Sequence, residues 1–266
     1  MVVQGVLIAT LLIGLVGLFV GVFLGIAGIK FKVETDPKEE EVLNALPGNN
    51  CGGCGFAGCS GLAAAIAKGE APVNGCPVGG EPVAKVIASI MGVEAGETVK
   101  MAAFVKCQGD CDKAHTDYEY TGVKDCSMLA FVPSGGPKSC NHGCLGYGNC
   151  VKACPFDAIH VVNGIAVVDK DACKACGKCV EACPKGLIEL IPYDSKIRVS
   201  CSSKDKGPVA MKACDVACIG CGLCARNCPE QAITVTDNLA KIDYTKCTQC
   251  GTCIEKCPKK AIIKED

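Results

Sequence analysis

The feature that most restricts how this chain can fold is its cysteine content, 25 cysteines in 266 residues. Many of them fall in runs of the form C-x2-C-x2-C-x3-C-P, such as CIGCGLCARNCP at residues 218–229 and CTQCGTCIEKCP at residues 247–258. Sulfur atoms so close along the chain are poorly placed to form disulfides with one another, whereas their thiolates can converge on one metal centre. The runs therefore indicate metal binding in a reducing compartment rather than a secreted disulfide scaffold.

An internal repeat organises the C-terminal half of the chain. CPFDAIHVVNGIAVVDKDAC aligns with CPEQAITVTDNLAKIDYTKC, and each predicts a short helix and then a hairpin, with turns at Asn163-Gly164 and Asp237-Asn238. Residues 139–193 and 215–266 are therefore predicted to be two copies of one module. Six cysteines recur at an offset of 74 residues: Cys150, Cys154, Cys173, Cys176, Cys179 and Cys183 match Cys224, Cys228, Cys247, Cys250, Cys253 and Cys257.

Each module resembles the bacterial two-cluster ferredoxins, in which the fourth cysteine of each run binds the other of two [4Fe–4S] clusters. Zinc is the competing metal, but zinc ribbons separate their cysteine pairs by longer stretches than these runs do. The resemblance implies two crossed ligand sets in the second module: Cys218, Cys221, Cys224 and Cys257, and Cys228, Cys247, Cys250 and Cys253. In the first module it implies Cys154, Cys173, Cys176 and Cys179, and Cys140, Cys144, Cys150 and Cys183.

The last of these sets has an irregular run, SCNHGCLGYGNCVKACP, in which the gaps between cysteines are three, five and three residues. Under the 74-residue offset, Cys140 aligns with Cys214, and Tyr147 stands where a partner of Cys221 would lie. We expect Cys140 to fill the ligand position that Tyr147 leaves vacant. The alternative is that this cluster is ligated differently.

A different cysteine motif, CGGCGFAGC, begins at residue 51 and is followed by a more distant Cys-Pro. Ser60 is expected to cap a helix over residues 61–68 that ends at Gly69, which would bring the distant cysteine back toward the first three. Four converging thiolates suit one more [4Fe–4S] cluster, with zinc or unmetallated thiols as the alternatives. The motif resembles the small iron–sulfur domain of corrinoid iron–sulfur proteins and of Rnf B subunits. Its predicted ligands are Cys51, Cys54, Cys59 and Cys76.

The N-terminal segment predicts a membrane anchor. Residues 6–29 are 24 residues without a charge, which is enough for a spanning helix, and no basic residue precedes them as in a signal peptide. Lys30 and Lys32 follow directly, so the positive-inside rule predicts that the rest of the chain is cytoplasmic. We therefore expect a single-pass protein of the cytoplasmic (inner) membrane.

The parts together resemble the B subunits of the Rnf family, the ion-translocating ferredoxin:NAD⁺ oxidoreductases, over essentially the whole chain. This resemblance implies an electron-transfer subunit that takes electrons from reduced soluble ferredoxin and passes them to other subunits of a membrane complex. The chain would belong to a translocase without a substrate-transforming site of its own. The alternative is a polyferredoxin-type subunit of a membrane hydrogenase or dehydrogenase. No basic stripe with interleaved aromatic residues occurs, which argues against a nucleic-acid partner.

The predicted fold class is α+β, with a transmembrane helix, a small helical iron–sulfur domain and two ferredoxin-like modules. A short helix is expected to begin near Asp36-Pro37 and to stop at Pro47-Gly48. The predicted boundaries are residues 1–30 for the anchor, 31–46 for a linker, 47–95 for the single-cluster domain, 96–138 for a connecting segment, 139–193 for the first module, 194–214 for a connector and 215–266 for the second module.

Five cysteines remain outside these sets: Cys107, Cys111, Cys126, Cys201 and Cys214. The stretches AFVKC, IRVSC and DYEYTGVKDC each predict a strand that leads to one of them. We expect five [4Fe–4S] clusters and, as a hypothesis, a sixth held by Cys107, Cys111, Cys126 and one of Cys201 or Cys214. The alternative is that these cysteines are small, buried, reduced side chains.

Overall fold

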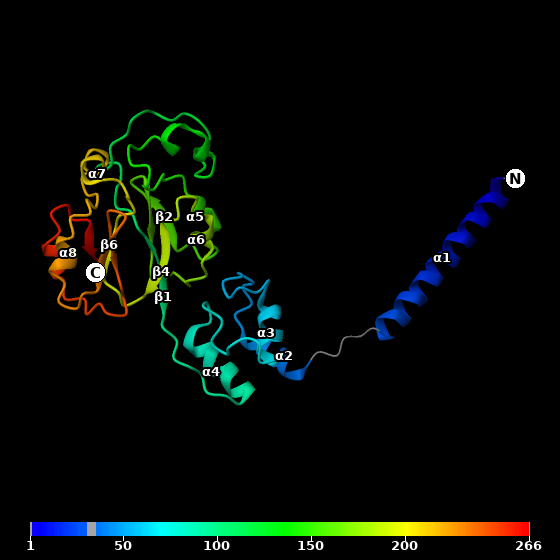
Figure 1. The fold of residues 1–266 in the computed structure, drawn as a ribbon. Coiled ribbons are helices and arrows are strands. Elements are labelled where there is room, and N and C mark those ends of the chain that lie inside the picture. The colour runs from blue at the N-terminus through cyan, green and yellow to red at the C-terminus, as the bar shows by residue number, and fades with distance from the viewer. Residues whose placement is uncertain (1, 31–35, 266) are drawn as a thin grey trace.

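The computed structural model describes residues 2–30 and 36–265, and its first element is one long helix (Figure 1). This helix, α1 (Val2–Lys30), contains a stretch at Leu11–Gly28 with a mean hydropathy of 2.6, none of it buried against the rest of the chain. By length and composition it can cross a membrane, as predicted. Lys32 and the first part of the predicted linker, residues 31–35, lie outside the described residues.

Three helices form the small domain that follows: α2 (Pro37–Ala45), α3 (Cys59–Ala67) and α4 (Gly80–Met91). The predicted start of α2 is confirmed, because the Asp36 carboxylate accepts the Lys38 N–H at 2.9 Å. Their shared core consists of fully buried aliphatic side chains from all three helices, with Val42, Leu62, Ile66 and Ile87 at 1% exposure or less. Helix α4 was not predicted from the sequence.

The start of α3 differs from the prediction that Ser60 caps it. The helix begins at Cys59, and the side-chain oxygen of Asn50 accepts the Cys59 N–H at 2.8 Å. The residue that satisfies the first turn therefore comes from the preceding loop rather than from the helix boundary. The helix stops one residue short of Lys68, and Gly69 takes the left-handed conformation at φ +75°, close to the predicted end.

Both predicted hairpins are confirmed. In the first module β2 (Ile159–Val162) pairs antiparallel with β3 (Ile165–Val168), and in the second β6 (Ile233–Thr236) pairs with β7 (Leu239–Ile242). Both turn residues in each hairpin have positive φ, the conformation that two-residue hairpin loops need. One-turn helices follow the cysteine loops: α5 (Asn149–Ala153) and α6 (Lys178–Ala182) in the first module, α8 (Leu223–Arg226) and α9 (Thr252–Glu255) in the second.

Each module also has a two-stranded sheet that the repeat did not reveal. Strand β1 (Met101–Val105) pairs antiparallel with β4 (Ile188–Pro192), and β5 (Ile197–Val199) pairs with β8 (Ile262–Lys264). The next backbone hydrogen bonds are equivalent too, since Lys106 donates to Leu187 O at 2.8 Å and Ser200 to Ala261 O at 2.9 Å. Leu187 and Ala261 are themselves 74 residues apart. Strands β1 and β5, which lie in the predicted connectors, thus occupy matching positions.

The predicted strands before Cys107 and Cys201 are confirmed by β1 and β5, whereas the strand predicted before Cys126 is wrong. Residues 118–125 form no strand, and the nearby backbone pairing is a single bridge between Thr116 and Lys138. Beyond that bridge the hydroxyl of Tyr118 donates to Pro133 O at 2.8 Å, so the segment is fixed by side-chain contacts instead of a strand partner. Two short 3₁₀ turns, at Met128–Phe131 and Pro133–Gly135, complete this long loop.

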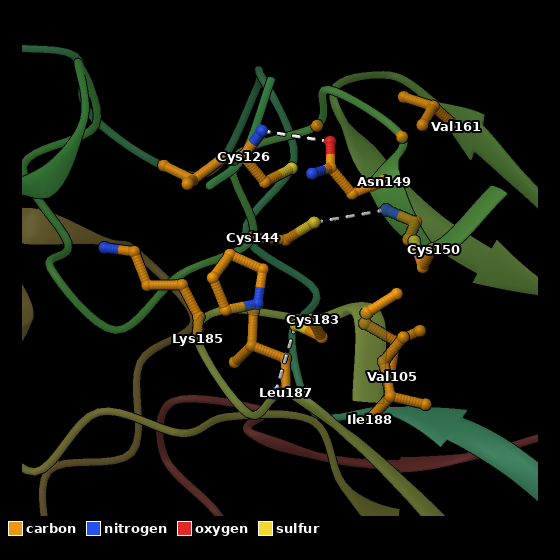
Figure 2. Close-up of a pocket in the computed structure, with 16 residues that line it drawn as sticks. Val105, Cys126, Cys144, Asn149, Cys150, Val161, Cys183, Lys185, Leu187 and Ile188 are labelled. Atoms are coloured by element: carbon orange, nitrogen blue, oxygen red, sulfur yellow. Dashed lines mark hydrogen bonds between the residues drawn. The ribbon is translucent and has the colours of Figure 1, made fainter. Parts of the chain in front are cut away.

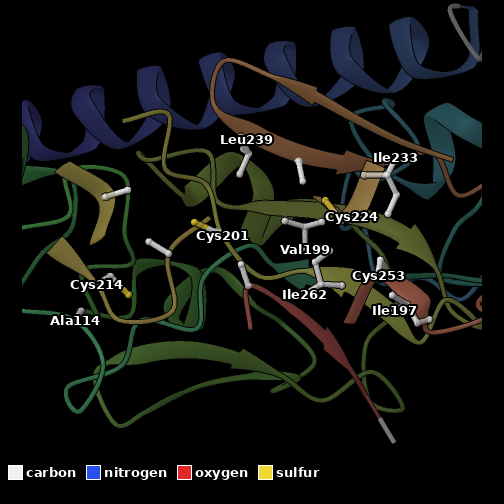
Figure 3. Packing of buried hydrophobic residues seen from close by; sticks show 14 residues of the cluster. Ala114, Ile197, Val199, Cys201, Cys214, Cys224, Ile233, Leu239, Cys253 and Ile262 are labelled. Atoms are coloured by element: carbon white, nitrogen blue, oxygen red, sulfur yellow. The ribbon is translucent and has the colours of Figure 1, made fainter. Parts of the chain in front are cut away.

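The two modules pack against each other along the loop that follows β1. Residues 113–115 form backbone hydrogen bonds with α7 (Gly207–Ala213) and the residue pair after it: His115 donates to Ala213 O at 3.0 Å and Asp215 donates to Lys113 O at 2.9 Å. On its other side, His115 O accepts the Ser139 N–H at 2.9 Å. In the second module the buried core includes cysteine side chains, among them Cys201, Cys214, Cys224 and Cys253 (Figure 3). The sulfur atoms are therefore part of the hydrophobic packing.

A glycine in the irregular run tests this close packing. Gly146 has φ +76°, and a Cβ there would lie 2.5 Å from Gly164 O in the β2–β3 turn. Gly186 has φ +61° but open space around it, so Gly186→Ala is a matched control. Both substitutions incur left-handed strain of about 1 kcal/mol, and only Gly146→Ala adds a backbone clash. We expect the visible absorbance of the iron–sulfur clusters to be lost on heating at a clearly lower temperature in Gly146→Ala than in Gly186→Ala. Equal shifts in the two variants would contradict this packing.

Candidate metal centres

Several groups of four cysteines line cavities rather than surround a single point. All 25 are free thiols. Within the described residues, no three cysteine, histidine or acidic side chains are close enough to hold one metal ion. A zinc site needs its sulfurs about 2.3 Å from one centre, whereas a cube of iron and sulfide spreads its four thiolates farther apart. The arrangement therefore fits clusters better than zinc.

The second module brings together both predicted sets. Cys218, Cys221, Cys224 and Cys257 line one cavity, and Cys228, Cys247, Cys250 and Cys253 line another. Burial, followed by the nearby Cys247 thiolate, raises the pKa of Cys253 to about 11. The Ala261 N–H donates to the Cys257 sulfur at 3.3 Å. Such N–H groups favour the thiolate, the form that binds iron.

The structure also brings together the regular set of the first module. Cys179 lies among the other three members, and burial followed by the thiolates of Cys173, Cys176 and Cys154 raises its pKa to about 12. The N–H of Ala103 in β1 donates to the Cys173 sulfur at 3.4 Å, so the added strand contributes to this site. Four thiols in such a setting resist deprotonation together unless a cation compensates their charge.

The irregular run forms a different set from the predicted one. Cys126, Cys144, Cys150 and Cys183 line one cavity, and Figure 2 shows their sulfur atoms directed toward the space between them. Cys140 lines a separate cavity. The position that corresponds to Cys221 is therefore occupied by a cysteine from the long loop after β1, and Tyr147 packs instead against Tyr120, with ring centroids 6.1 Å apart.

Asn149, the first residue of α5, holds Cys126 in this cavity. Its side-chain oxygen accepts the Cys126 N–H at 3.0 Å. Its amide donates to the Asp125 carboxylate at 3.0 Å and to the Ser127 hydroxyl at 3.1 Å. These three hydrogen bonds join the loop around Cys126 to the start of α5, 23 residues later in the chain. The spacing of the cysteines in the sequence gives no indication of this contact.

In the small domain, Cys54, Cys59 and Cys76 pack on the helical core. Burial raises the pKa of Cys76, with smaller contributions from the thiolates of Cys59 and Cys54, and Gly79 donates its N–H to the Cys76 sulfur at 3.4 Å. Cys51 is on the side facing the first module, near enough for its thiolate to add to the effect of burial on the pKa of Cys176. The two parts are in tight contact, because a Cβ on Gly53 would lie 2.6 Å from Cys176 O.

The remaining cysteines do not gather as the sequence hypothesis grouped them. Cys107 lines a cavity with Cys140, Cys201 and Cys214, whereas Cys126 belongs to the cavity described above. Cys111 is exposed, with its N–H donated to Asn163 O at 3.0 Å. Two sequence signals pointed to this group: the alignment of Cys140 with Cys214 under the 74-residue offset, and the predicted strands that lead to Cys107 and Cys201.

Comparison with protein families identifies three cysteine-rich regions. Residues 46–78 match the family described as "Putative Fe-S cluster". Residues 136–184 and 217–261 each match a family described as "4Fe-4S dicluster domain". The chain therefore carries iron–sulfur domains of the ferredoxin type, in agreement with the fold.

Curated relatives match most of the chain. It is 48% identical to the B subunit of the Na⁺-translocating ferredoxin:NAD⁺ oxidoreductase complex of Acetobacterium woodii, over 91% of this chain and 73% of the relative. It is 46% identical to the B subunit of the ion-translocating oxidoreductase complex of Methanosarcina acetivorans, over 86% of this chain and 87% of that protein. Identity is also 46% to the B subunit of the proton-translocating ferredoxin:NAD⁺ oxidoreductase complex of Clostridium ljungdahlii, over 86% and 81%.

Alkylation of the exposed thiols tests metal binding in the isolated protein. Cys111, Cys221 and Cys250 are exposed, but only the last two line cavities. A hydrogen bond with the Thr252 side chain lowers the pKa of Cys250. Without bound metal, Cys250 should therefore be more reactive than an ordinary exposed cysteine, because more of it is thiolate. We expect iodoacetamide to modify Cys111 first in protein purified without oxygen, and Cys250 first after iron is removed, as measured by peptide mass spectrometry. Rapid modification of Cys250 before iron removal would contradict metal binding there.

Proposed function

This chain belongs to the family of B subunits of ion-translocating oxidoreductase complexes, and we propose that it carries electrons from reduced soluble ferredoxin toward the other subunits of such a complex. The observation that carries the proposal is that cysteines from distant parts of the chain come together in neighbouring groups, several of which line a cavity. NAD⁺ reduction and ion movement belong to the partner subunits, since the chain presents metal centres and no nucleotide-binding motif.

Five sets of cysteines are proposed to hold [4Fe–4S] clusters, and three of these sets each line a cavity. Each bound cluster can accept and donate one electron at low potential. The second set of the first module is revised from the sequence expectation, with Cys126 in place of Cys140. The five ligand sets are Cys51, Cys54, Cys59 and Cys76; Cys154, Cys173, Cys176 and Cys179; Cys126, Cys144, Cys150 and Cys183; Cys218, Cys221, Cys224 and Cys257; and Cys228, Cys247, Cys250 and Cys253.

The protein residues adjust each site through hydrogen bonds and burial. Ala166 N–H donates to the Cys144 sulfur and Leu187 N–H to the Cys183 sulfur, both at 3.4 Å. A donor at sulfur stabilises the more negative, reduced state and so raises the reduction potential. Apolar side chains such as Val105 and Ile188 line the same cavity and exclude water from it.

Contacts between sets suggest the path of the electrons. The small domain adjoins the first module where Gly53 meets Cys176. Within the first module the thiolate of Cys150 is close enough to contribute, after burial and three nearer cysteines, to the raised pKa of Cys179. Within the second module the thiolate of Cys224 likewise contributes, after burial and Cys247, to the raised pKa of Cys253. The site of the small domain and the two sites of the first module thus follow one another. The two sites of the second module lie on the other side of the junction between the modules.

Helix α1 is proposed to anchor the chain in the membrane, with the iron–sulfur domains on the cytoplasmic side. Support comes from the apolar stretch and from Lys30 in its last turn, in line with the positive-inside rule. Labelling of the exposed Cys111 by a membrane-impermeant maleimide tests this orientation, since labelling of intact cells would contradict it.

A second candidate function is electron transfer within a membrane hydrogenase or dehydrogenase. The two ferredoxin-like modules suit either role, but the relatives that match most of the chain are subunits of ion-translocating oxidoreductases. Purification from the native membrane separates the two. Flavin-bearing partner subunits support the proposal, and a nickel-containing partner would replace it with the alternative.

Electron transfer from ferredoxin is tested with the full chain in detergent. A bacterial two-cluster ferredoxin is reduced with titanium(III), freed of reductant and mixed with the affinity-tagged chain without oxygen. After separation on the tag, we expect EPR signals of reduced clusters in the chain and oxidised ferredoxin in the flow-through. A mixture with oxidised ferredoxin is the control. No signal after ferredoxin, although titanium(III) alone reduces the same clusters, would refute the proposed electron donor.

The revised ligand set is tested at Asn149. Asn149→Ala removes three hydrogen bonds that hold the Cys126 segment, each worth about 1 kcal/mol. We expect it to lose up to one cluster, about four iron atoms per chain, with the other EPR signals retained. The control is Asn227→Ala, whose side chain donates to Leu223 O at 2.8 Å within α8. Equal iron content in both variants would contradict a role for this contact in cluster binding.

A further inference from the structure

We propose that the junction of the two modules is a sixth [4Fe–4S] site, held by Cys107, Cys140, Cys201 and Cys214, and that electrons pass between the modules through it. These four thiols line one cavity, as Cys218 and the rest of its set line another. Two of them are nearly inaccessible, Cys201 at 9% exposure and Cys214 at 6%. The site itself stands on geometry alone, whereas the passage of electrons through it rests on the proposed function.

The four sulfurs lie close together. A Cβ built on Gly109 would be 3.2 Å from the Cys214 sulfur and 3.8 Å from the Cys107 sulfur, so both face the same small space beside this glycine. The Cys140 thiol is within electrostatic range of both Cys107 and Cys214, and that of Cys201 is within range of Cys140. Each cysteine therefore has at least one other member of the set as a neighbour.

The repeat gives independent support, because each module supplies an equivalent pair. Cys140 and Cys214 are 74 residues apart, the offset of the repeat. Cys107 and Cys201 each lie two residues beyond the matching strands β1 and β5. The two modules therefore each contribute one pair of thiols to the junction, from equivalent places in the chain. A random set of spare cysteines would not share these positions.

Hydrogen bonds at the sulfurs show the same equivalence between the modules. The Cys144 N–H donates to the Cys107 sulfur at 3.4 Å, and the Cys218 N–H donates to the Cys201 sulfur at 3.3 Å. Cys144 and Cys218 occupy equivalent positions in the repeat, and each lines a cavity proposed to hold a cluster in its own module. The junction is thus joined on both sides to a neighbouring site through one N–H···S contact.

The surroundings suit an anionic group. Ser203 gives a further N–H to the Cys201 sulfur at 3.4 Å. Lys138 lines the cavity at 8% exposure, and its ammonium donates to Gly109 O at 2.8 Å and Gly164 O at 3.0 Å. Within the described residues no carboxylate pairs with this ammonium, and a buried cation is costly without compensating charge. A cluster on four thiolates supplies that negative charge.

The modules also hold the cavity from both sides. Gln108, next to Cys107, donates its side-chain amide to Lys260 O of the second module at 2.7 Å. Ser202, next to Cys201, donates its hydroxyl to Lys106 O of the first module at 3.0 Å. These reciprocal contacts fix the two pairs of thiols relative to each other. In each passage the module that gives up an electron is oxidised and the receiving module is reduced by one electron, and no bond is made or broken.

Iron and sulfide analysis of the full chain, purified without oxygen, tests the site. Six clusters predict about 24 iron atoms per chain, and the double variant Cys201→Ala/Cys214→Ala about 20. Cys111→Ala, which removes the exposed cysteine outside the cavities, should retain about 24. EPR of the reduced double variant should lose one signal and keep the rest, which verifies that it folds. About 20 iron atoms in the wild type, with the four cysteines recovered as free thiols or disulfides, would overturn the site.

Freeze-quench EPR after mixing with reduced ferredoxin tests the passage of electrons. We expect the double variant to lose rapid reduction of the clusters in one module while those in the other still fill at the wild-type rate. If both modules fill at the wild-type rate in the double variant, the passage through the junction is refuted and the site remains. If ferredoxin reduces no cluster in fully loaded wild type, the proposed function fails, and the iron content still decides the site.

Discussion

The structure depends on thiols that converge in small apolar spaces from distant parts of the chain. Burial raises the pKa of Cys150 to about 11 and that of Cys179 to about 12, because a thiolate there has lost its water. Iron compensates this charge, so metal binding and folding are coupled. The helices beside the sites, α5, α6, α8 and α9, have only four or five residues and cannot persist alone. A cluster bound beside them would hold these short helices in place.

The same constraint explains the relation between the modules. Each module adds one strand, β1 or β5, to the ferredoxin-like unit, and each strand ends two residues before a cysteine that reaches the junction. Arg198 of β5 also lies over the ring of Phe104 in β1, 5.0 Å from its centroid, and is nearly inaccessible. The modules are thus joined by apolar and charged contacts that hold the thiols of the junction at fixed separation. A row of redox sites needs this rigidity, since every transfer depends on the spacing between neighbours.

The features that were predicted correctly from the sequence are those determined by residues close together in the chain. The hairpin turn at Asn163-Gly164 and the regular C-x2-C-x2-C runs are set by residues next to one another, so their pattern is legible without a structure. The start of α3 was mispredicted because Asn50, nine residues earlier, provides the hydrogen bond expected from Ser60. The membership of Cys126 depends on Asn149, across a loop with no strand partner. Contacts of this kind are fixed by tertiary packing, which single-sequence spacing does not encode.

An experimental density map of the full chain, recorded from protein kept without oxygen and with anomalous scattering at the iron edge, tests the account most directly. We expect the map to show iron bound to the sulfur atoms of Cys126, Cys144, Cys150 and Cys183. It should also show a separate iron centre between the modules, bound to Cys107, Cys140, Cys201 and Cys214. A map with Cys140 bound to iron beside Cys144, with Cys126 away from any iron and no centre at the junction, would contradict it.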